Sequence, residues 1–275
     1  MKTLPSSGSS TGKRHSGFLL SKWYLDCIAH DGTTFVGYAA QLRWKSLSLR
    51  YSSFLIRRVD GSLHSATSFL QAPLPHREGA VIHWSPRPLK TDGEWNCVQP
   101  SVERELYKNH AGSITWSCCS PMTRTRIAVN KSTLIEGIGY AERLTISIPP
   151  WQLPIELLRW GRFHSENDSL VWIDWRGPVS QRFLFHNSEE VAAPSIADHE
   201  IEGAKNLRLS LKRTAVLRDG PIISDTLAMI PGAKKIFPHS ILQLYESKWL
   251  SRGEMFFDNS SCGSGWAIHE LVSFR

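Results

Sequence analysis

The sequence lacks the motifs that would place it at once in several large enzyme classes. It has no HExxH pattern of zinc proteases, no phosphate-binding P-loop and no nucleophile elbow joining a strand to a helix. Gly137-Ile138-Gly139 has no third glycine at the spacing that a dinucleotide fingerprint requires. These absences argue against a zinc protease, a P-loop NTPase, an α/β hydrolase and a Rossmann dehydrogenase.

Cysteines are few and poorly spaced for a structural role. The five cysteines are an odd number and include no CxxC pair. Such usage favours reduced thiols in a cytoplasmic protein over a disulfide scaffold, and it argues against a metal site. The eleven histidines are scattered. We therefore expect no metal and no cofactor.

Long apolar runs and dense clusters of basic residues are also missing. No apolar run approaches the roughly 18 residues of a membrane-spanning helix. Residues 1–18 are rich in Ser, Gly, Lys and Thr, which predicts a disordered tail and not a secretory signal. The net charge of +7 comes from dispersed basic residues, so we expect it to serve solubility and predict no nucleic-acid partner. Contact with a membrane surface stays open, as does the oligomeric state.

Aromatic residues and strand-like alternation are abundant. The chain has eleven tryptophans and eleven phenylalanines, which fit half-buried sheet surfaces and apolar pockets. The turns Asp31-Gly32 and Asp60-Gly61 each lie between alternating apolar segments, which is typical of β-hairpins. Many short antiparallel strands indicate an all-β fold of barrels or sandwiches with few short helices. The one helix candidate is 241–250.

The segment 133–148 alternates most clearly. Its even positions, from Leu134 through Tyr140 to Ile148, predict one apolar strand face, and Gly137 and Gly139 on the other face predict a bend or a close backbone approach. Pro149-Pro150 ends the strand. Residues 160–175 then repeat the pattern of residues 23–38. The repeat predicts two similar β domains, at 19–149 and 150–275.

Four carboxyl groups share strand faces with apolar residues, namely Glu142, Glu270, Asp174 and Asp26. Burial raises the pKa of a carboxyl group, which makes it a proton donor near neutral pH and a candidate catalytic acid. The structural alternative is that each acid pairs with an arginine, for which the sequence offers Arg143, Arg159, Arg162 and Arg176. We expect any site on the inner faces of the barrels. The candidate substrate-binding residues there are Trp23, Tyr140, Trp160, Arg162, Trp172, Trp175 and Trp266.

Several short segments, taken in order, resemble a known family. They are Trp23-Tyr24-Leu25-Asp26 before the Asp31-Gly32 turn; Gly139-Tyr140-Ala141-Glu142 with Pro150-Trp151 and Trp160-Gly161-Arg162; and the closing 265–270. Together they resemble the lipocalin-like hydroxyneurosporene synthase (carotenoid 1,2-hydratase) and AttH-like family. The resemblance implies two consecutive lipocalin-like barrels. It also implies a hydratase, isomerase or cyclase that acts on an isoprenoid or carotenoid-like substrate without a redox cofactor.

Three hypotheses follow from these observations. The first is a cofactor-independent acid–base enzyme acting on a large apolar molecule. The second is a lipocalin-like carrier that binds a lipophilic small molecule without changing it, in which case the acids are structural. The third, prompted by the charge of +7, is a β protein that binds nucleic acid.

Overall fold

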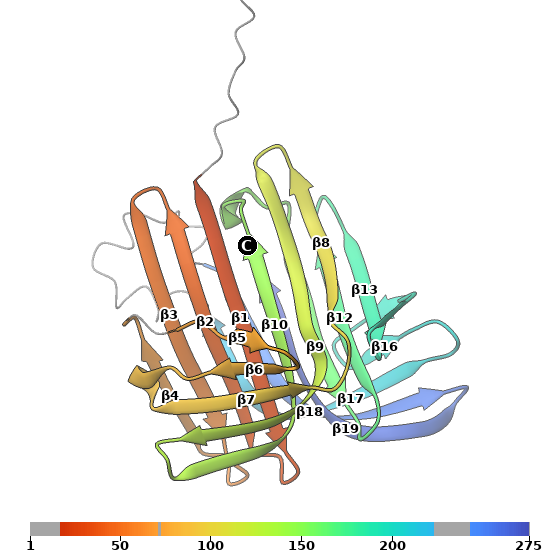
Figure 1. Ribbon diagram of the computed structural model, residues 1–275. Helices are drawn as coiled ribbons and strands as arrows, with labels where there is room; N and C mark the ends of the chain where they lie inside the picture. Colours follow the sequence, from red (N-terminus) through yellow and green to blue (C-terminus); the bar gives the residue numbers. More distant parts are fainter. Residues whose placement is uncertain (1–16, 71–72, 223–242, 275) are drawn as a thin grey trace, which may run out of the picture.

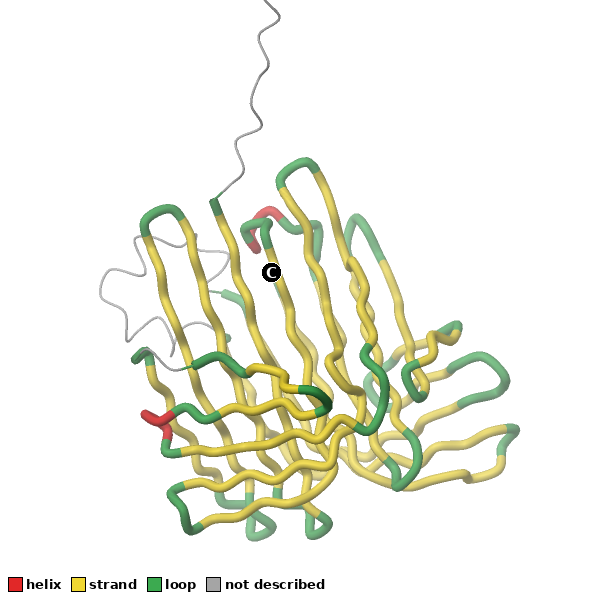
Figure 2. The backbone as a smooth tube through the Cα atoms, viewed as in Figure 1, coloured by secondary structure: helices red, strands yellow, loops and turns green. Residues whose placement is uncertain are grey.

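The computed structural model describes residues 17–70, 73–222 and 243–274, and these residues form strands almost throughout (Figure 2). Two single helical turns interrupt the strands, η1 at Arg87–Leu89 and η2 at Pro150–Gln152. The described part of the chain is thus all-β, as the alternation predicted. Most of the expected tail lies outside the described residues.

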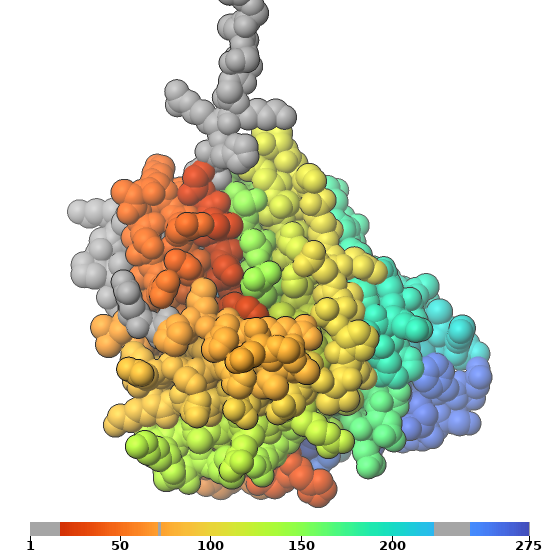
Figure 3. Space-filling model, viewed as in Figure 1, coloured from red at the N-terminus to blue at the C-terminus, as the bar shows by residue number. Residues whose placement is uncertain are grey.

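The first sheet contains ten strands in the order β4-β3-β2-β1-β10-β9-β7-β6-β5, with β8 also paired to β9. Their bounds are β1 Phe18–Ala29, β2 Thr34–Trp44, β3 Leu47–Arg57, β4 Leu63–Ser68, β5 His76–Glu78, β6 Val81–Trp84, β7 Thr91–Cys97, β8 Val102–Asn109, β9 Gly112–Val129 and β10 Thr133–Ile146. In Figure 1, β5, β6 and β7 cross in front of the lower halves of β1, β2 and β3. The space-filling view shows the upper part of these strands left uncovered on that side (Figure 3).

The second sheet contains nine strands in the order β14-β13-β12-β11-β19-β18-β17-β16-β15. Their bounds are β11 Leu157–His164, β12 Ser169–Arg176, β13 Gln181–His186, β14 Glu189–Val191, β15 Ser195–Ile196, β16 Glu200–Glu202, β17 Arg208–Pro221, β18 Tyr245–Phe257 and β19 Ser260–Ser273. In each sheet the first strand pairs with the last, β1 with β10 and β11 with β19. Apart from β8, the two halves therefore share one strand order, and the change of sheet falls between Ile146 and Leu157. The finer boundary between 149 and 150 stays a prediction.

Three apolar cores hold the described residues together. One lies within the first sheet and includes Trp23, Phe35 and Trp95, while another lies within the second and includes Phe163 and Trp172. The third joins the two sheets and contains Tyr24, Trp116, Tyr140, Trp160, Val171, Ile173, Trp175, Leu250 and Ile268, among others. Alternate residues of β1 explain the division, because Trp23, Leu25 and Cys27 enter the first core while Tyr24 and Ile28 enter the third. Burial on both faces makes β1 a strand shared by two cores.

The apolar face expected along 133–148 is present only in the second half of the segment. Tyr140, Ile146 and Ile148 are buried as expected, whereas Leu134 is exposed and Ile135, on the opposite face, is buried in the core of the first sheet. The pairing of β10 with β1 is continuous from Ile146 to Gly137, so the faces of β10 do not switch, and Leu134 lies beyond the end of that pairing. The register shifts opposite Gly139–Glu142 place the extra residues in β9.

The glycines of β10 make the close backbone approach that their position predicted. A Cβ atom at Gly139 would overlap the backbone oxygen of Asp26 and the hydroxyls of Thr125 and Thr123. Gly139→Ala is therefore expected to lower the free energy of unfolding by about 1–3 kcal/mol, the usual cost of forcing atoms into a packed interior. Urea unfolding measures the loss. Gly263→Ala is the control, because a Cβ there would meet only the Ser165 side chain, and a larger loss for the control would contradict the explanation.

The helix expected at 241–250 is wrong for the part that the structure describes. Residues 241 and 242 lie outside the described ranges, and Tyr245–Phe257 forms strand β18, paired with β17 and β19. The segment alternates Glu246, Lys248 and Leu250 on one face with Ser247, Trp249 and Ser251 on the other, so its true period is two. Within the described ranges, no helix has the length and apolar character to cross a membrane.

Candidate functional site

The carboxyl groups of Glu142 and Glu270 lie between the two sheets. Glu142 on β10 contacts Trp160 on β11, and Glu270 on β19 shares a face with Ile268, a member of the core that joins the sheets. Both groups had been expected on the inner face of a barrel. Their actual place follows from β1, β10, β11 and β19 being central strands, each with one face turned toward the other sheet.

The Glu142 carboxylate receives three hydrogen bonds on a single oxygen. Its Oε2 accepts from Trp116 Nε1 at 2.5 Å, from the Tyr140 hydroxyl at 2.7 Å and from Trp160 Nε1 at 3.1 Å. Burial raises the pKa of Glu142, and the Trp116 and Tyr140 donors oppose that rise. No described residue hydrogen-bonds to Oε1. Among the described residues, Oε1 is therefore the oxygen of Glu142 that no donor occupies.

Glu270 belongs to a buried charged group centred on Lys248. The Lys248 ammonium contacts Glu270 Oε2, lies 3.0 Å from Glu246 Oε1 and donates a hydrogen bond of 2.7 Å to the Tyr38 hydroxyl. Arg218 Nε approaches the other oxygen of Glu246 at 3.3 Å. Burial and the neighbouring Glu246 charge raise the pKa of Glu270, whereas Lys248 and Arg218 hold the pKa of Glu246 low. Because Lys248 and Arg218 both stabilise the Glu246 anion, Glu270 is the acid that retains a proton.

Aromatic rings connect the two carboxyl groups. The Lys248 nitrogen lies 4.9 Å from the ring centre of Tyr24, 5.3 Å from that of Tyr38 and 5.7 Å from that of Trp160. Trp160 also stands directly opposite Glu270 in the pairing of β11 with β19, while its indole N–H reaches Glu142. We call this set the intersheet cluster: Tyr24, Tyr38, Trp116, Tyr140, Glu142, Trp160, Glu246, Lys248 and Glu270. Its aromatic faces can stabilise a positive charge that develops near either acid.

Asp26, a predicted catalytic acid, is instead held in an ion pair across the sheets. Arg162 donates through Nε to Oδ2 at 2.9 Å and through Nη2 to Oδ1 at 2.7 Å, and both side chains are fully buried. Burial raises the pKa of Asp26, and the guanidinium opposes the rise. The two-pronged geometry is that of an ionised carboxylate. Tyr24 lies beside this pair, and its buried hydroxyl has no aligned hydrogen-bond partner among the described residues.

Asp174, the fourth predicted acid, is surrounded by arginines. Arg176 Nε lies 2.7 Å from Oδ2 and Arg182 Nε lies 3.4 Å from Oδ1, while Arg159 approaches at 3.9 Å. The structural alternative therefore holds for Asp26 and Asp174, and Arg143 instead lies over Trp23. Within the described residues, Glu142 has no arginine partner.

The seven predicted substrate-binding residues do not line a single space. Trp23 lies in the core of the first sheet and Trp172 in that of the second, so neither faces the intersheet cluster. Trp175 donates to the Pro154 carbonyl, and Trp266 lies 3.6 Å from the Arg252 guanidinium. Of these seven residues, Tyr140 and Trp160 are the two that hydrogen-bond to Glu142. Successive residues of a strand point to opposite faces, so aromatic residues that are close in sequence, such as Trp172 and Trp175, lie in different cores.

Sequence reasoning missed five members of the cluster as site residues: Tyr24, Tyr38, Trp116, Glu246 and Lys248. Two of them were hidden by reading 241–250 as a helix. Glu246 and Lys248 alternate with small and aromatic residues on β18, and that spacing of two was the signal that could have revealed them. The spacing of residues in one strand does not reveal which residue lies opposite in the next strand. The structure shows that Lys248 lies opposite Glu270 in the pairing of β18 with β19.

Comparisons with known proteins show that solved structures share this fold. No family model and no curated protein matches the sequence. Among solved structures, kievitone hydratase from Nectria haematococca aligns over 94% of this chain and 89% of its own, with 10% identity and a TM-score of 0.57. The chain has a two-domain lipocalin-like fold.

Two further structures support the same fold. CghA, solved with Sch210972, aligns over 98% of this chain and 93% of its own at 11% identity and a TM-score of 0.54. A proposed AttH protein from Nitrosomonas europaea aligns over 99% of both chains at 10% identity and a TM-score of 0.54. The predicted fold class is confirmed. At these identities the likeness concerns the fold alone, and a closer relation to hydroxyneurosporene synthase stays a prediction.

Proposed function

We propose that this protein is a cofactor-independent acid–base enzyme of the hydratase, isomerase or cyclase type, acting on a large apolar substrate at the intersheet cluster. One observation carries the proposal. Two carboxyl groups whose pKa values are raised by burial, Glu142 and Glu270, are joined by aromatic rings between the sheets. Such a pair supplies an acid and a base within one largely apolar setting.

Glu270 is assigned the role of the acid. Its proton adds to one carbon of a double bond, so a C–H bond forms as the π bond breaks and the neighbouring carbon becomes positive. The faces of Tyr24 and Trp160 stabilise that cation. Lys248 and Glu246 position Glu270, and burial together with the neighbouring Glu246 charge keeps its proton available.

Glu142 is assigned the role of the base. For a hydratase, water forms a C–O bond with the cation and transfers a proton to Oε1, the oxygen that the three donors to Oε2 leave open. For an isomerase, Oε1 removes a proton from carbon; for a cyclase, a second double bond attacks the cation first. In each case the proton gained by Glu142 returns through solvent to Glu270, which completes the cycle.

The fold neighbours support the reaction class but not the substrate. One of them is named a hydratase, and its fold covers nearly the whole of this chain. The isoprenoid or carotenoid-like substrate rests on the short sequence segments that resemble hydroxyneurosporene synthase. We extend that substrate class to this protein as part of the proposal.

Proton transfer to carbon can be tested before the natural substrate is known. The purified protein is incubated in D2O with a panel of polyprenyl alcohols and linear carotenes, and mass spectrometry follows deuterium bound to carbon and the addition of water. Glu142→Gln is expected to lower the rate by about 10²- to 10⁴-fold, the usual contribution of a positioned acid or base. The amide oxygen still accepts from the Trp116, Tyr140 and Trp160 donors, so the fold is retained.

Glu136→Gln provides the matched control. Glu136 lies on the same strand, is exposed, and pairs with Arg126 on the surface. This variant is expected to keep the wild-type rate. Equal rates in wild type and Glu142→Gln would remove Glu142 from the chemistry. Recovery of a tightly bound panel molecule with neither deuterium nor added water would favour the carrier instead.

A further inference from the structure

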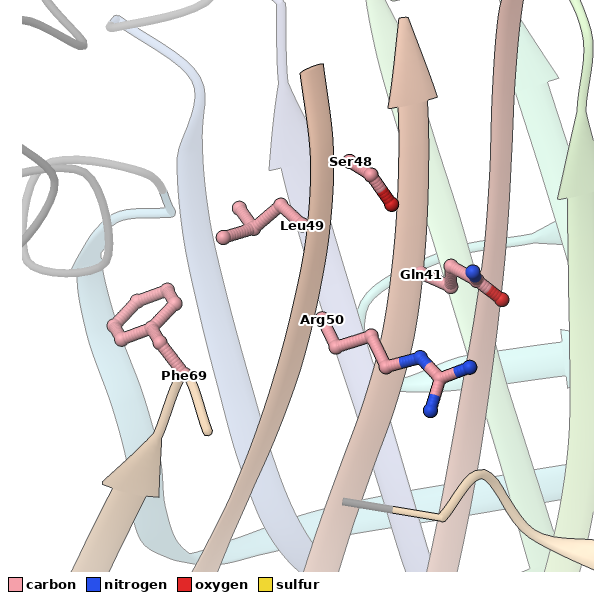
Figure 4. Close-up of a pocket in the computed structure, with 5 residues that line it drawn as sticks. All are labelled: Gln41, Ser48, Leu49, Arg50 and Phe69. Atoms are coloured by element: carbon pink, nitrogen blue, oxygen red, sulfur yellow. The ribbon is translucent and has the colours of Figure 1, made fainter. Parts of the chain in front are cut away.

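A pocket lies on the first sheet, and no described residue of the intersheet cluster lines it. It has a volume of about 300 Å3 and is lined by Gln41, Ser48, Leu49, Arg50 and Phe69. Figure 4 shows the polar ends of Gln41, Ser48 and Arg50 on one side of β3, with Leu49 and Phe69 on its other side. The volume is at the low end of the range for small-molecule sites.

The pocket forms where β3 runs beyond its neighbour. β4 pairs with β3 only from Ser52 to Arg57, so among the described strands residues 47–51 have β2 as their sole partner. Phe69 follows the end of β4, and its ring packs against Tyr51 at 5.5 Å between centres. The Tyr51 hydroxyl in turn donates to Ser53 at 2.7 Å. An aromatic wall therefore lies beside the edge of β3 at residues 47–51, which pairs with no described strand on that side.

The polar side of the pocket offers hydrogen-bond donors. Gln41 and Arg50 stand directly opposite each other in the pairing of β2 with β3, and Ser48 lies two residues from Arg50 on the same face. All three point away from the face of β2 that carries Tyr38, so this pocket is separate from the intersheet cluster. Gln41 and Arg50 are half-buried, and Ser48 is exposed.

Arg50 lacks an anionic partner in the part of the chain that the structure describes. Neither an ion pair nor a side-chain hydrogen bond joins its guanidinium to another described residue. Arg43, which stands opposite Ser48, adds a second positive charge at the rim. A half-buried guanidinium whose N–H groups meet no acceptor among the described residues is costly alone and matches a carboxylate or phosphate oxygen pair.

We propose that this pocket binds a small soluble organic anion, a carboxylate or a phosphate ester, whose apolar part contacts Leu49 and Phe69. Arg50 holds the anionic group through two N–H donors, and Gln41 and Ser48 donate to the remaining oxygens. The apolar part crosses the edge of β3 at residues 47–51 toward Phe69. This site is independent of the proposed catalysis, since its polar residues lie on the face of β2 opposite to Tyr38 and no described residue of the intersheet cluster lines the pocket.

The test is binding of 2-naphthoate to the full chain, measured by calorimetry, with neutral 2-naphthamide as the uncharged counterpart. Naphthoate is expected to bind at least about tenfold more tightly than naphthamide, because a hydrogen bond to a charged group contributes about 1.5–3 kcal/mol. Arg50→Gln is expected to weaken naphthoate about ten- to a hundredfold on the same basis. Arg57→Gln on the same strand removes the same charge from outside the pocket and should leave affinity unchanged.

Other outcomes would overturn the proposal. Equal affinities for the acid and the amide, or equal losses in the Arg50→Gln and Arg57→Gln variants, would show that the pocket does not select an anion through Arg50. Competition by phosphatidylglycerol vesicles that depends on Arg50 would assign the site to a membrane headgroup instead. If Arg50→Gln fails to fold, Arg50→Lys keeps the charge but not the fork of donors, and an unchanged affinity in that variant would contradict the two-pronged contact.

Discussion

Replacing Arg162 with methionine is expected to lower the free energy of unfolding by about 3–5 kcal/mol, the cost of leaving a buried charge without its partner. Asp26 and Arg162 are both fully buried and joined by two hydrogen bonds between β1 and β11. In the variant, Asp26 must either remain charged in an apolar setting or take up a proton. The loss is measured from urea unfolding at pH 7.

The control is an ion pair of the same types on the surface. Arg126 lies 3.2 Å from Glu136 with both side chains more than half exposed, so Arg126→Met is expected to cost less than about 1 kcal/mol. Similar losses in the Arg126 and Arg162 variants would contradict the assigned role of the buried pair. Adding Asp26→Asn to Arg162→Met should recover part of the loss, because the orphaned charge is then gone.

The pH dependence of the Arg162 variant has a definite sign. Burial raises the pKa of Asp26, and removal of the guanidinium takes away the main opposing influence. A carboxyl group whose pKa is higher in the folded state contributes stability at low pH and loses it as the pH rises through the folded pKa. The Arg162→Met protein is therefore expected to approach wild-type stability in acid and to fall behind it toward neutral pH.

Much of the fold could be predicted from local sequence because its signals are local. Asp31-Gly32 and Asp60-Gly61 form the turns between β1 and β2 and between β3 and β4, as their composition indicated. The match of 160–175 to 23–38 corresponds to equivalent hairpins, β11–β12 and β1–β2. The strand at 245–257 was missed although its alternation has a period of two, and the bulges in β9 were missed because they depend on how β9 pairs with β10.

The candidate site could be predicted only in part. Glu142 and Glu270 stood out as acids on apolar faces, and that pattern is visible in one strand at a time. Whether such an acid meets an arginine or a lysine depends on which strand lies opposite. Asp26 accepts a hydrogen bond from Arg162, which is 136 residues away in the sequence, and Lys248 donates one to Tyr38, which is 210 residues away. No periodicity encodes contacts between two sheets, so the structure was needed to separate the paired acids from the available ones.

Glu270→Gln is the second variant for which we expect a large effect. If Glu270 supplies the proton, the rate of carbon protonation should fall by about 10²- to 10⁴-fold. Glu254→Gln on the neighbouring strand is the matched control, since Glu254 is exposed and its carboxylate accepts a hydrogen bond from Ser261. A wild-type rate in Glu270→Gln would assign the acid to another group.

The pH profile separates a catalytic role of Glu270 from a structural one. Burial and the Glu246 charge raise the pKa of Glu270 to about 7, so the acid form is lost as the pH rises through neutrality. The wild-type rate is therefore expected to decline above about pH 7, and wild-type stability should decline over the same range because the folded state binds the extra proton. Glu246 does not disturb this range, because its pKa is lowered to about 2. His269 stays neutral there, since burial lowers its pKa to about 4.

The amide of Glu270→Gln cannot titrate, so this variant lacks the proton-binding site that stabilises the wild type at lower pH. The free energy of unfolding of the wild type minus that of the variant should therefore decrease as the pH rises from 6.5 to 8. A difference independent of pH would mean that Glu270 is ionised throughout this range and cannot be the acid.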